Sequence, residues 1–366
     1  MRFALSLAAA ALAAAAPAAP PLKLNDIQVL GSHNSFKDRI PPAVLARIRA
    51  ASPAQADALD YYHLPLTAQL DSGLRQLEID VMADPQGGRF APPSGEALAK
   101  AAGEATGFDA AAMRRPGFKV FHVPDVDYRS HCISFVDCLR EVDAWSRAHP
   151  GHLPLMLTIN AHDVPLNRPG LTDPLRLDGR LLDALDAEIR SVLGPDRLVT
   201  PDQVRGRHST LRNAVLAGNW PALAAARGRI FLLFDVPIDI ADRYRTGHPS
   251  LKGRAMFAYF DDKQAESATI VVQDPIADGD AIRRWVRDGY IVRTRADADT
   301  VEARARDGRK AAAAAASGAQ AVSTDYYPGA PDPLGKGFVV TLPGGAYARC
   351  NPVRRPEPGC TLPGPM

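Results

Sequence analysis

The sequence lacks the features of a fibrous, disordered or nucleic-acid-binding protein. Its 43 basic and 41 acidic side chains nearly cancel, leaving a formal net charge of +2, so no global positive field is available to attract a nucleic acid. No Gly-x-y period occurs and 46% of the residues are hydrophobic, which excludes a collagen-like or disordered chain. The length allows one domain or two, since a single α/β barrel can occupy about 250 residues or more.

Cysteine is scarce, with four in 366 residues. No Cys-x-x-Cys and no Cys beside a His pair is present, which disfavours a zinc site. The cysteines form two local pairs, Cys132 with Cys138 and Cys350 with Cys360. Three pairings are possible in principle, and two short-range disulfides are the simplest in an exported chain.

The amino terminus has the layout of a signal peptide. Arg2 precedes an apolar stretch from Phe3 to Ala16, and small residues at 16–19 offer a cleavage site. The stretch is short for a membrane-spanning helix. We therefore expect residues 1–19 to be removed, the mature protein to span 22–366, and its location to be secreted or periplasmic.

Short apolar runs alternate with helical patterns along the mature chain. Eight runs are predicted strands: 27–31, 74–81, 118–122, 153–159, 229–235, 255–260, 290–293 and 319–324. Helical periodicity covers 134–148, 179–193, 280–288 and 300–317. This alternation predicts a parallel (β/α)8 barrel of the TIM type. An open doubly wound sheet would show the same alternation, but no Gly-x-Gly-x-x-Gly follows any predicted strand.

Two stretches interrupt the alternation. Residues 84–117 are rich in Ala, Gly and Pro, and the tail from Tyr326 onward is dense in Pro and Gly. Neither has the composition of a second packed domain. We expect a single domain with one long excursion and a Pro/Gly-rich C-terminal tail.

Polar residues gather at the ends of the first four predicted strands. They comprise His33 and Asn34 after the first strand, Arg75, Glu78 and Asp80 in the second, His122 with Asp125 and Asp127 after the third, and Asn160, His162 and Asp163 after the fourth. Catalytic groups of a barrel lie where strands meet the following loops. The four clusters should therefore converge on one site.

The chemistry of this set favours a hard cation and proton transfer. Glu78 and Asp80 lie two apart on a strand and point to the same side, so their charges repel unless a cation lies between them. Carboxylate oxygens, with amide oxygens from Asn34 and Asn160, suit Ca²⁺ or Mg²⁺. His33 and His122 would remain free for acid and base steps, as in phosphodiester cleavage.

These residues resemble the calcium-dependent phosphatidylinositol-specific phospholipase C family, and its bacterial secreted branch in particular. The likeness rests on the runs 31–36 and 73–81 and on a His after the third strand. It continues through 132–138, 149–150, 292–297 and 318–326, and so covers nearly all of the mature chain.

The resemblance implies an (α/β)8 barrel with one Ca²⁺ ion, catalytic His33 and His122, and Ca²⁺ ligands Asn34, Glu78 and Asp80. The inositol 2-hydroxyl would attack the phosphorus, diacylglycerol would leave with a proton from a histidine, and a cyclic inositol phosphate would form. We expect His122 to be the acid and His33 the stabiliser of the phosphate.

One position departs from the family pattern. Asn160 stands where eukaryotic relatives have a glutamate ligand, and His162 stands where bacterial relatives often have a lysine. We keep Asn160 in the expected ligand set, but the lost charge should weaken Ca²⁺ binding. Asp125, Asp163 or Asp325 could compensate.

A second group of residues is expected to bind the substrate: Arg75, Arg293, Arg295, Asp325 and Tyr326. The arginines could equally neutralise carboxylates inside the barrel. The expected partners are a phosphatidylinositol-type lipid and, transiently through loops within 84–117, a membrane surface. We expect a monomer and no nucleic acid partner.

Two other functions fit the sequence. A glycerophosphodiester phosphodiesterase would share the barrel, the divalent metal and two histidines, although it normally has a further Glu at the metal. A non-catalytic lipid- or carbohydrate-binding barrel is the third possibility, for which Asn160 is the supporting sign.

Overall fold

The computed structural model describes residues 20–105, 107–356 and 360–364. The predicted signal peptide at 1–19 lies outside the described residues. Among the residues described, no helix has the length and apolar character needed to cross a bilayer.

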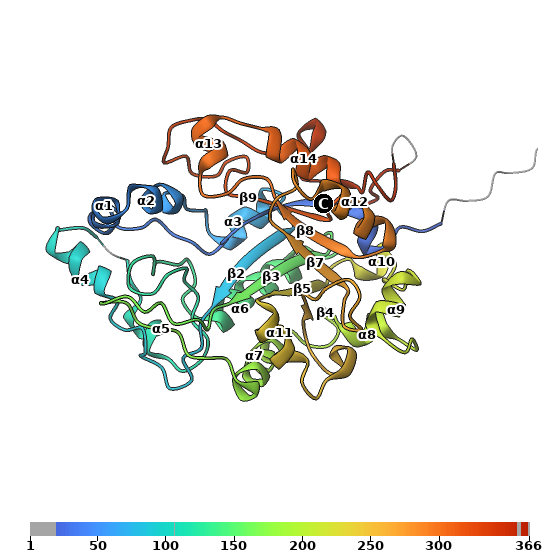
Figure 1. The fold of residues 1–366 in the computed structure, drawn as a ribbon, viewed down its shortest axis with the longest axis horizontal. Helices are drawn as coiled ribbons and strands as arrows, with labels where there is room; N and C mark the ends of the chain where they lie inside the picture. The colour runs from blue at the N-terminus through green and yellow to red at the C-terminus, as the bar shows by residue number, and fades with distance from the viewer. Residues whose placement is uncertain (1–19, 106, 357–359, 365–366) are drawn as a thin grey trace, which may run out of the picture.

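A parallel sheet forms the centre of the molecule, and helices cover its outer side (Figure 1). The strands are β1 (Ile27–Ser32), β2 (Gln76–Val81), β3 (Leu155–Ala161), β4 (Leu198–Val199), β5 (Ile230–Asp235), β6 (Phe257–Ala258), β7 (Thr269–Val272), β8 (Ile291–Arg295), β9 (Ala321–Thr324) and β10 (Ala348–Cys350). Because both faces of the sheet are covered, these strands are buried over most of their length, as all-parallel sheets require.

Eight parallel strands form a ring within the described residues. Pairing runs continuously through β7, β8, β9, β1, β2, β3, β5 and β6. A single parallel bridge between Tyr259, directly after β6, and Thr269 of β7 closes the ring. The predicted (β/α)8 barrel is therefore confirmed. Strand β4 pairs with the start of β5, and β10 pairs antiparallel with β1.

One predicted barrel strand is wrong and one barrel strand was missed, and the short strands β4 and β10 outside the ring were not predicted either. Segment 118–122 is not a barrel strand, because β2 pairs directly with β3 along its whole length. The segment instead passes antiparallel to the end of β2, where the backbones of Met82 and Lys119 exchange two hydrogen bonds of 2.9 Å. The missed strand, β7, has only four residues.

The helices connect the strands around the barrel. They are α1 (Pro42–Ala51), α2 (Pro53–Leu59), α3 (Leu66–Asp71), α4 (Ser94–Ala101), α5 (Ala110–Arg114), α6 (Phe135–Ala148), α7 (Gly179–Val192), α8 (Pro201–Arg205), α9 (Leu211–Leu216), α10 (Leu223–Ala226), α11 (Ile238–Arg245), α12 (Gly279–Asp288), α13 (Val301–Ala305) and α14 (Arg309–Ser317), with 3-10 turns η1 (Leu24–Asp26), η2 (Pro249–Leu251) and η3 (Pro343–Gly345).

The predicted helices at 134–148, 179–193 and 280–288 are confirmed as α6, α7 and α12 to within one residue at each end. The predicted helix at 300–317 is two helices, because Arg306 takes a left-handed conformation (φ 54°) and ends α13. The excursion at 84–117 contains α4 and α5. Phe90 and Met113 of this excursion belong to a small apolar cluster that also includes Phe121, which follows the excursion.

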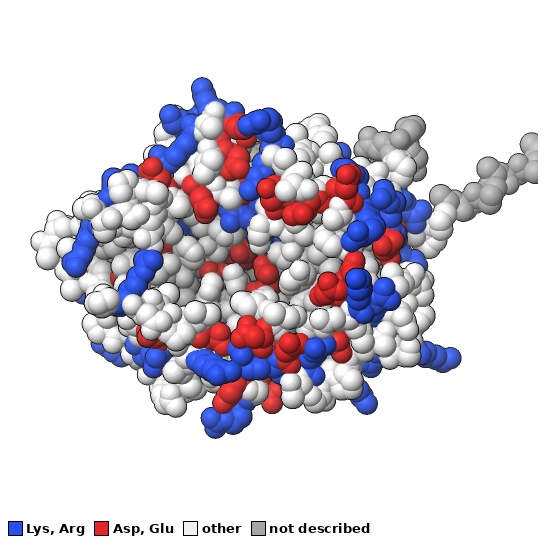
Figure 2. Space-filling view, viewed as in Figure 1, with Lys and Arg blue, Asp and Glu red and all other residues white. Residues whose placement is uncertain are grey.

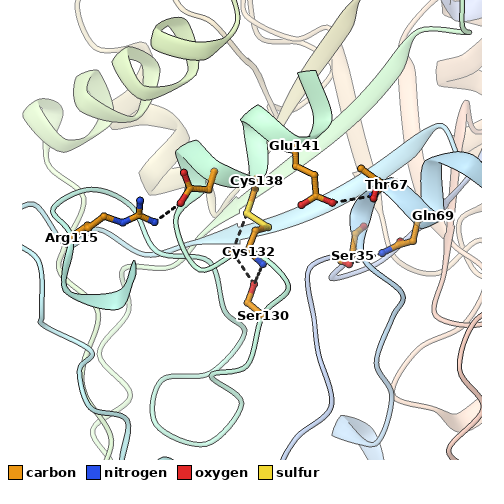
Figure 3. The surroundings of a disulfide bond; sticks show 9 residues. Ser35, Thr67, Gln69, Arg115, Ser130, Cys132, Cys138 and Glu141 are labelled. Atoms are coloured by element: carbon orange, nitrogen blue, oxygen red, sulfur yellow. Dashed lines mark hydrogen bonds and ion pairs between the residues drawn. A yellow bond between two sulfur atoms is a disulfide. The ribbon is translucent and has the colours of Figure 1, made fainter. Parts of the chain in front are cut away.

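Both predicted disulfides are present. Cys132–Cys138 joins the segment before α6 to the first turn of that helix, and Figure 3 shows it near Glu141 of α6. Glu141 accepts a hydrogen bond of 3.1 Å from the backbone of Thr67 in α3. Cys350–Cys360 joins the tail to the last residue of β10, and β10 pairs with β1 of the barrel. The tail, which was predicted as a loop, is therefore attached to the barrel.

Candidate active site

A cavity of about 730 Å³ lies at the carboxyl ends of β2, β3, β5, β6 and β7. Its lining includes His122, Asn160 and His162, with Asp235 at the end of β5 and Gln273 just after β7. A hollow near the middle of the face in Figure 2 contains acidic side chains. The cavity lies where a barrel carries its catalytic groups.

His33, directly after β1, is held on both ring nitrogens. Its Nδ1 lies 3.1 Å from Asp325 Oδ1, and its Nε2 lies 3.1 Å from a guanidinium nitrogen of Arg295. Because a guanidinium only donates hydrogen bonds, Nε2 accepts from Arg295 and Nδ1 donates to Asp325. Burial and the positive charge of Arg295 lower the pKa of His33 to about 4, so its ring is neutral at pH 7.

Asp325 connects several charged groups behind His33. It accepts a hydrogen bond of 3.0 Å from Arg295, and Nε2 of His63 lies 3.5 Å from its carboxylate. Burial alone would raise the pKa of Asp325, but His33, His63 and Arg295 hold it well below its ordinary value. His63 also bonds the backbone oxygen of His33 at 2.7 Å. This set fixes both the backbone and the ring of His33.

The two carboxylates of β2 are each paired through one oxygen. Glu78 Oε2 accepts a hydrogen bond from Arg293, and its Oε1 lies 3.8 Å from Nε2 of His33. Asp80 Oδ2 lies 3.2 Å from Nε2 of His162. Burial alone would lower the pKa of His162, but the hydrogen bond to Asp80 and the charges of Asp80 and Glu78 outweigh burial and raise that pKa.

A row of polar side chains crosses three neighbouring strands. Asp80 of β2 is in register with Asn160 of β3, which is in register with Asp235 of β5. Burial and the negative charges of Glu78 and Asp80 raise the pKa of Asp235 to about 6. Asp235 therefore adds a third carboxylate to the electrostatic field of this region.

His122 belongs to a second hydrogen-bonded set. Its Nδ1 lies 2.8 Å from Asp127 Oδ2, and Lys37 Nζ lies 3.3 Å from the other oxygen of Asp127. Lys37 lies over the ring of Tyr61, whose hydroxyl is 3.3 Å from Nδ1 of His33. The two predicted catalytic histidines are therefore linked through one continuous chain of contacts. His122 itself lines the catalytic cavity, with its Nδ1 held by Asp127.

Two buried oxygens of the predicted ligand set have no hydrogen-bond partner, Oδ1 of Asn34 and Oδ1 of Asp80. A buried oxygen that accepts no hydrogen bond is a favourable ligand for a hard cation, because the cation compensates for the lost solvation of that oxygen. Among the described residues, no group of three or more His, Cys, Asp or Glu side chains is arranged to hold a metal. A Ca²⁺ ion would thus need amide as well as carboxylate oxygens, and Asn34, Glu78, Asp80 and Asn160 fit that requirement.

Some predicted residues lie apart from these contacts. Arg75 precedes β2, where its side chain donates hydrogen bonds to Leu70 and Leu74 and lies over the ring of Trp145. Tyr326 is buried, with its ring against that of Phe338.

The carboxylates proposed to compensate for Asn160 also have other partners. Asp125 accepts hydrogen bonds from the backbones of Ser94 and Thr172. Asp163 pairs with Arg243 and accepts a hydrogen bond of 3.1 Å from the backbone of Leu177.

Two residues of this region were not predicted from the sequence, Asp235 and Tyr61. Asp235 could have been found, because it ends a predicted strand as the polar residues of the other clusters do. No sequence pattern marked Tyr61, which reaches the site by folding of the loop after α2.

Known structures share this fold at low sequence identity. A calcium-dependent phosphoinositol-specific phospholipase C from a Pseudomonas species has a TM-score of 0.53 and 14% identity, over 90% of this chain and 96% of that one. A Ca²⁺-dependent phosphatidylinositol-specific phospholipase C from Streptomyces antibioticus has a TM-score of 0.52 and 20% identity, over 84% of this chain and 96% of that one. At these identities the likeness shows the fold alone. No curated protein matches the chain.

The family model described as phosphoinositide phospholipase C, Ca²⁺-dependent, matches residues 22–352. This match covers the barrel strands and both sets of hydrogen bonds around His33 and His122. The chain therefore belongs to the Ca²⁺-dependent phosphoinositide phospholipase C family of enzymes.

Proposed function

We propose that this protein cleaves phosphatidylinositol-type lipids to diacylglycerol and a cyclic inositol phosphate. The inositol 2-hydroxyl oxygen would form the new bond to phosphorus, and the bond from phosphorus to the glycerol oxygen would break. The observation that carries this proposal is the presence of two histidines, His33 and His122, each oriented through Nδ1 by a buried carboxylate. Such a pair can take one proton and give another in a single displacement.

The contacts support a base role for His33, in place of the stabilising role expected from the sequence. Its ring is neutral at pH 7, and Nε2 carries the lone pair. Nε2 can therefore accept the proton of the 2-hydroxyl once Arg295 turns toward the phosphate. His122 keeps the expected role of acid, since Asp127 engages Nδ1 and Nε2 remains to protonate the leaving glycerol oxygen.

The chain also has groups to bind the phosphate and the metal. Arg293 and Arg295 lie beside Glu78 and His33, respectively, so either guanidinium could exchange a protein partner for a phosphate oxygen. The proposed Ca²⁺ ligands are Asn34, Glu78, Asp80 and Asn160, with Asp235 adding negative charge nearby. When bound, Ca²⁺ supplies positive charge to the phosphate and to the attacking hydroxyl.

Contact with a lipid surface is part of this proposal. Large apolar side chains are exposed within six residues of the carboxyl ends of four strands: Val164 after β3, Ile238 after β5, Ile276 after β7 and Val301 after β8. The described part of 84–117, where docking was expected, has no large apolar side chain of that exposure. We infer that the rim formed by these four residues contacts the membrane transiently.

We further propose that the protein is exported, which the two disulfides support, and that it acts as a monomer.

The rim can be tested with vesicles that contain phosphatidylinositol. An Ile276→Ser variant should bind them more weakly, while Leu216→Ser, at an exposed apolar position on α9, should bind like the parent. Equal binding by all three proteins would exclude the rim.

Product analysis tests the reaction itself. The purified mature protein is incubated with phosphatidylinositol micelles, with Ca²⁺ or with a calcium chelator, and the products are followed by phosphorus NMR. A cyclic inositol phosphate that forms only with Ca²⁺ supports the proposal. If no phosphorus product forms in either condition, the proposal is rejected, and glycerophosphodiesters become the substrates to test.

A further inference from the structure

A second, smaller cavity adjoins the catalytic one. It has a volume of about 330 Å³ and lies between α1, α4 and the loop at 168–171. Figure 1 shows α1 and α4 together at one end of the molecule. Four residues line both cavities: Gln55, Val123, Arg168 and Leu171. The two cavities are therefore neighbouring parts of one space, and we name the smaller part the annex.

The walls of the annex differ in chemistry from those of the catalytic cavity. Its apolar side chains are Val44 and Ile48 from α1, Leu98 from α4, and Val123, Val126 and Leu171. No acidic residue is among its described lining residues, whereas Asp163 and Asp235 line the catalytic cavity. Its volume lies at the lower end of the roughly 300–1,000 Å³ of small-ligand sites. Its polar lining residues, Arg47, Gln55, Ser94 and Arg168, are all solvent-exposed. The remaining apolar wall suits a flexible hydrocarbon group.

The annex starts beside the histidine that faces the leaving group. Val123 directly follows His122 and lines both cavities. In the proposed reaction, on which this inference rests, His122 protonates the oxygen of the departing diacylglycerol. The glycerol carbons must therefore lie near His122, and a chain that continues from them past Val123 enters the annex. We propose that the annex binds the first part of one acyl chain of the diacylglycerol moiety.

The walls of the annex are fixed to the segment that carries His122. Both side-chain oxygens of Asp125 accept backbone hydrogen bonds, from Ser94 of α4 at 2.8 Å and from Thr172 at 2.7 Å. The backbone of Gly95 also donates to the backbone oxygen of Asp125 at 2.8 Å. A Cβ atom at Gly95 would lie 2.4 Å from that same oxygen, so only glycine permits the approach. The annex is thus formed before any ligand binds, which lowers the entropic cost of binding.

The experiment compares two soluble substrates below any micelle concentration, so that no lipid surface contributes. One is dihexanoyl phosphatidylinositol, and the other is an inositol phosphodiester with methyl as its leaving group. Burial of each methylene group of the ligand contributes about 0.8 kcal/mol, which corresponds to an about fourfold gain in the binding constant. The parent enzyme should therefore prefer the dihexanoyl substrate at least tenfold in kcat/KM.

Two variants fill the annex from opposite walls, Ile48→Trp on α1 and Leu98→Trp on α4. Each should reduce the tenfold preference to about twofold or less, while kcat/KM for the methyl diester stays within about twofold of the parent. Leu216→Trp, at an exposed position that lines neither cavity, is the matched control and should keep the full preference. Melting temperatures identify any variant that fails to fold, and the second wall then provides the test.

The possible failures are distinguishable. If the parent turns over the methyl diester and the dihexanoyl substrate with equal kcat/KM, the annex inference is overturned while the proposed function stands. The same conclusion follows if both annex variants fold and keep the preference. If the parent cleaves neither substrate, the proposed function fails and the annex inference falls with it.

Discussion

Replacement of Asp325 by asparagine should nearly abolish turnover and leave substrate affinity intact. Asp325 is 1% exposed and accepts hydrogen bonds from Nδ1 of His33 and from Arg295. An asparagine has one acceptor oxygen for these two donors, and its amide group donates. If that amide faces His33, Nδ1 must accept and Nε2 must carry the proton. His33 then presents N–H, rather than a lone pair, to the 2-hydroxyl.

The magnitudes follow from the two roles of the carboxylate. Loss of a correctly placed base lowers kcat by about 10²- to 10⁴-fold, and KM should change less than threefold because Asp325 acts through His33. Arg295 is 8% exposed, and removing the carboxylate of a buried pair costs about 3–5 kcal/mol of unfolding free energy. The variant should therefore be less stable as well as slow.

The assay separates these two effects. kcat and KM are measured on the soluble methyl diester, unfolding is followed in urea, and the ¹⁵N shifts of His33 report which ring nitrogen carries the proton. Asp288→Asn, at an exposed position at the end of α12, controls for the loss of one negative charge. A folded Asp325→Asn variant with kcat within threefold of the parent, or with His33 still protonated on Nδ1, would refute the reasoning.

Three further predictions concern stability. Gly31→Ala should lose about 1–3 kcal/mol of unfolding free energy, measured in urea, because its Cβ would lie 2.5 Å from the backbone oxygen of Gln76. Gly179→Ala is the control, since a Cβ there would meet no neighbouring group within 4 Å. An equal loss in both variants would contradict the prediction. Burial and the charge of Asp325 raise the pKa of Asp297 to about 7, although the guanidinium of Arg295 opposes this rise. Between about pH 4 and 7, the folded state therefore holds a proton on Asp297 that the unfolded chain has lost. Asp297 should therefore contribute a fall of up to about 4 kcal/mol to the free energy of unfolding between pH 4 and 7. The lowered pKa of His33 contributes in the opposite direction over the same range, so the fall is measured as the difference in slope between the parent and Asp297→Asn, and equal slopes would count against it. The double variant Cys132→Ser/Cys138→Ser should lose about 2 kcal/mol of unfolding free energy, as expected for a loop of this length. The comparison is the parent without reducing agent, since a reductant would also open Cys350–Cys360, and an unchanged urea midpoint would be the contrary result.

Much of the barrel could be predicted because its strands and helices are encoded locally. Apolar runs such as 229–235 and the helical period of 179–193 predicted β5 and α7 nearly to their ends. Segment 118–122 has the same apolar character, yet it lies outside the barrel because β2 and β3 pair with each other. Which apolar segment enters the sheet depends on competition between distant strands, and a local pattern does not contain that competition.

The sequence by itself determined the chemical types at the site. His33 and Asn34 follow one strand, and the spacing of two between Glu78 and Asp80 places both carboxylates on one side of another. These facts depend only on neighbours along the chain and on the period of a β-strand. They were enough to predict oxygen ligands for a hard cation and a pair of histidines.

Only the tertiary structure decided the partner of each group. Arg293 pairs with Glu78 across 215 positions of sequence, and Arg295 and Asp325 hold His33 from 262 and 292 positions away. The sequence left open whether these arginines bind phosphate or carboxylates. The answer depends on the register of β8 and β9 against β1 and β2, which is set by packing around the whole barrel.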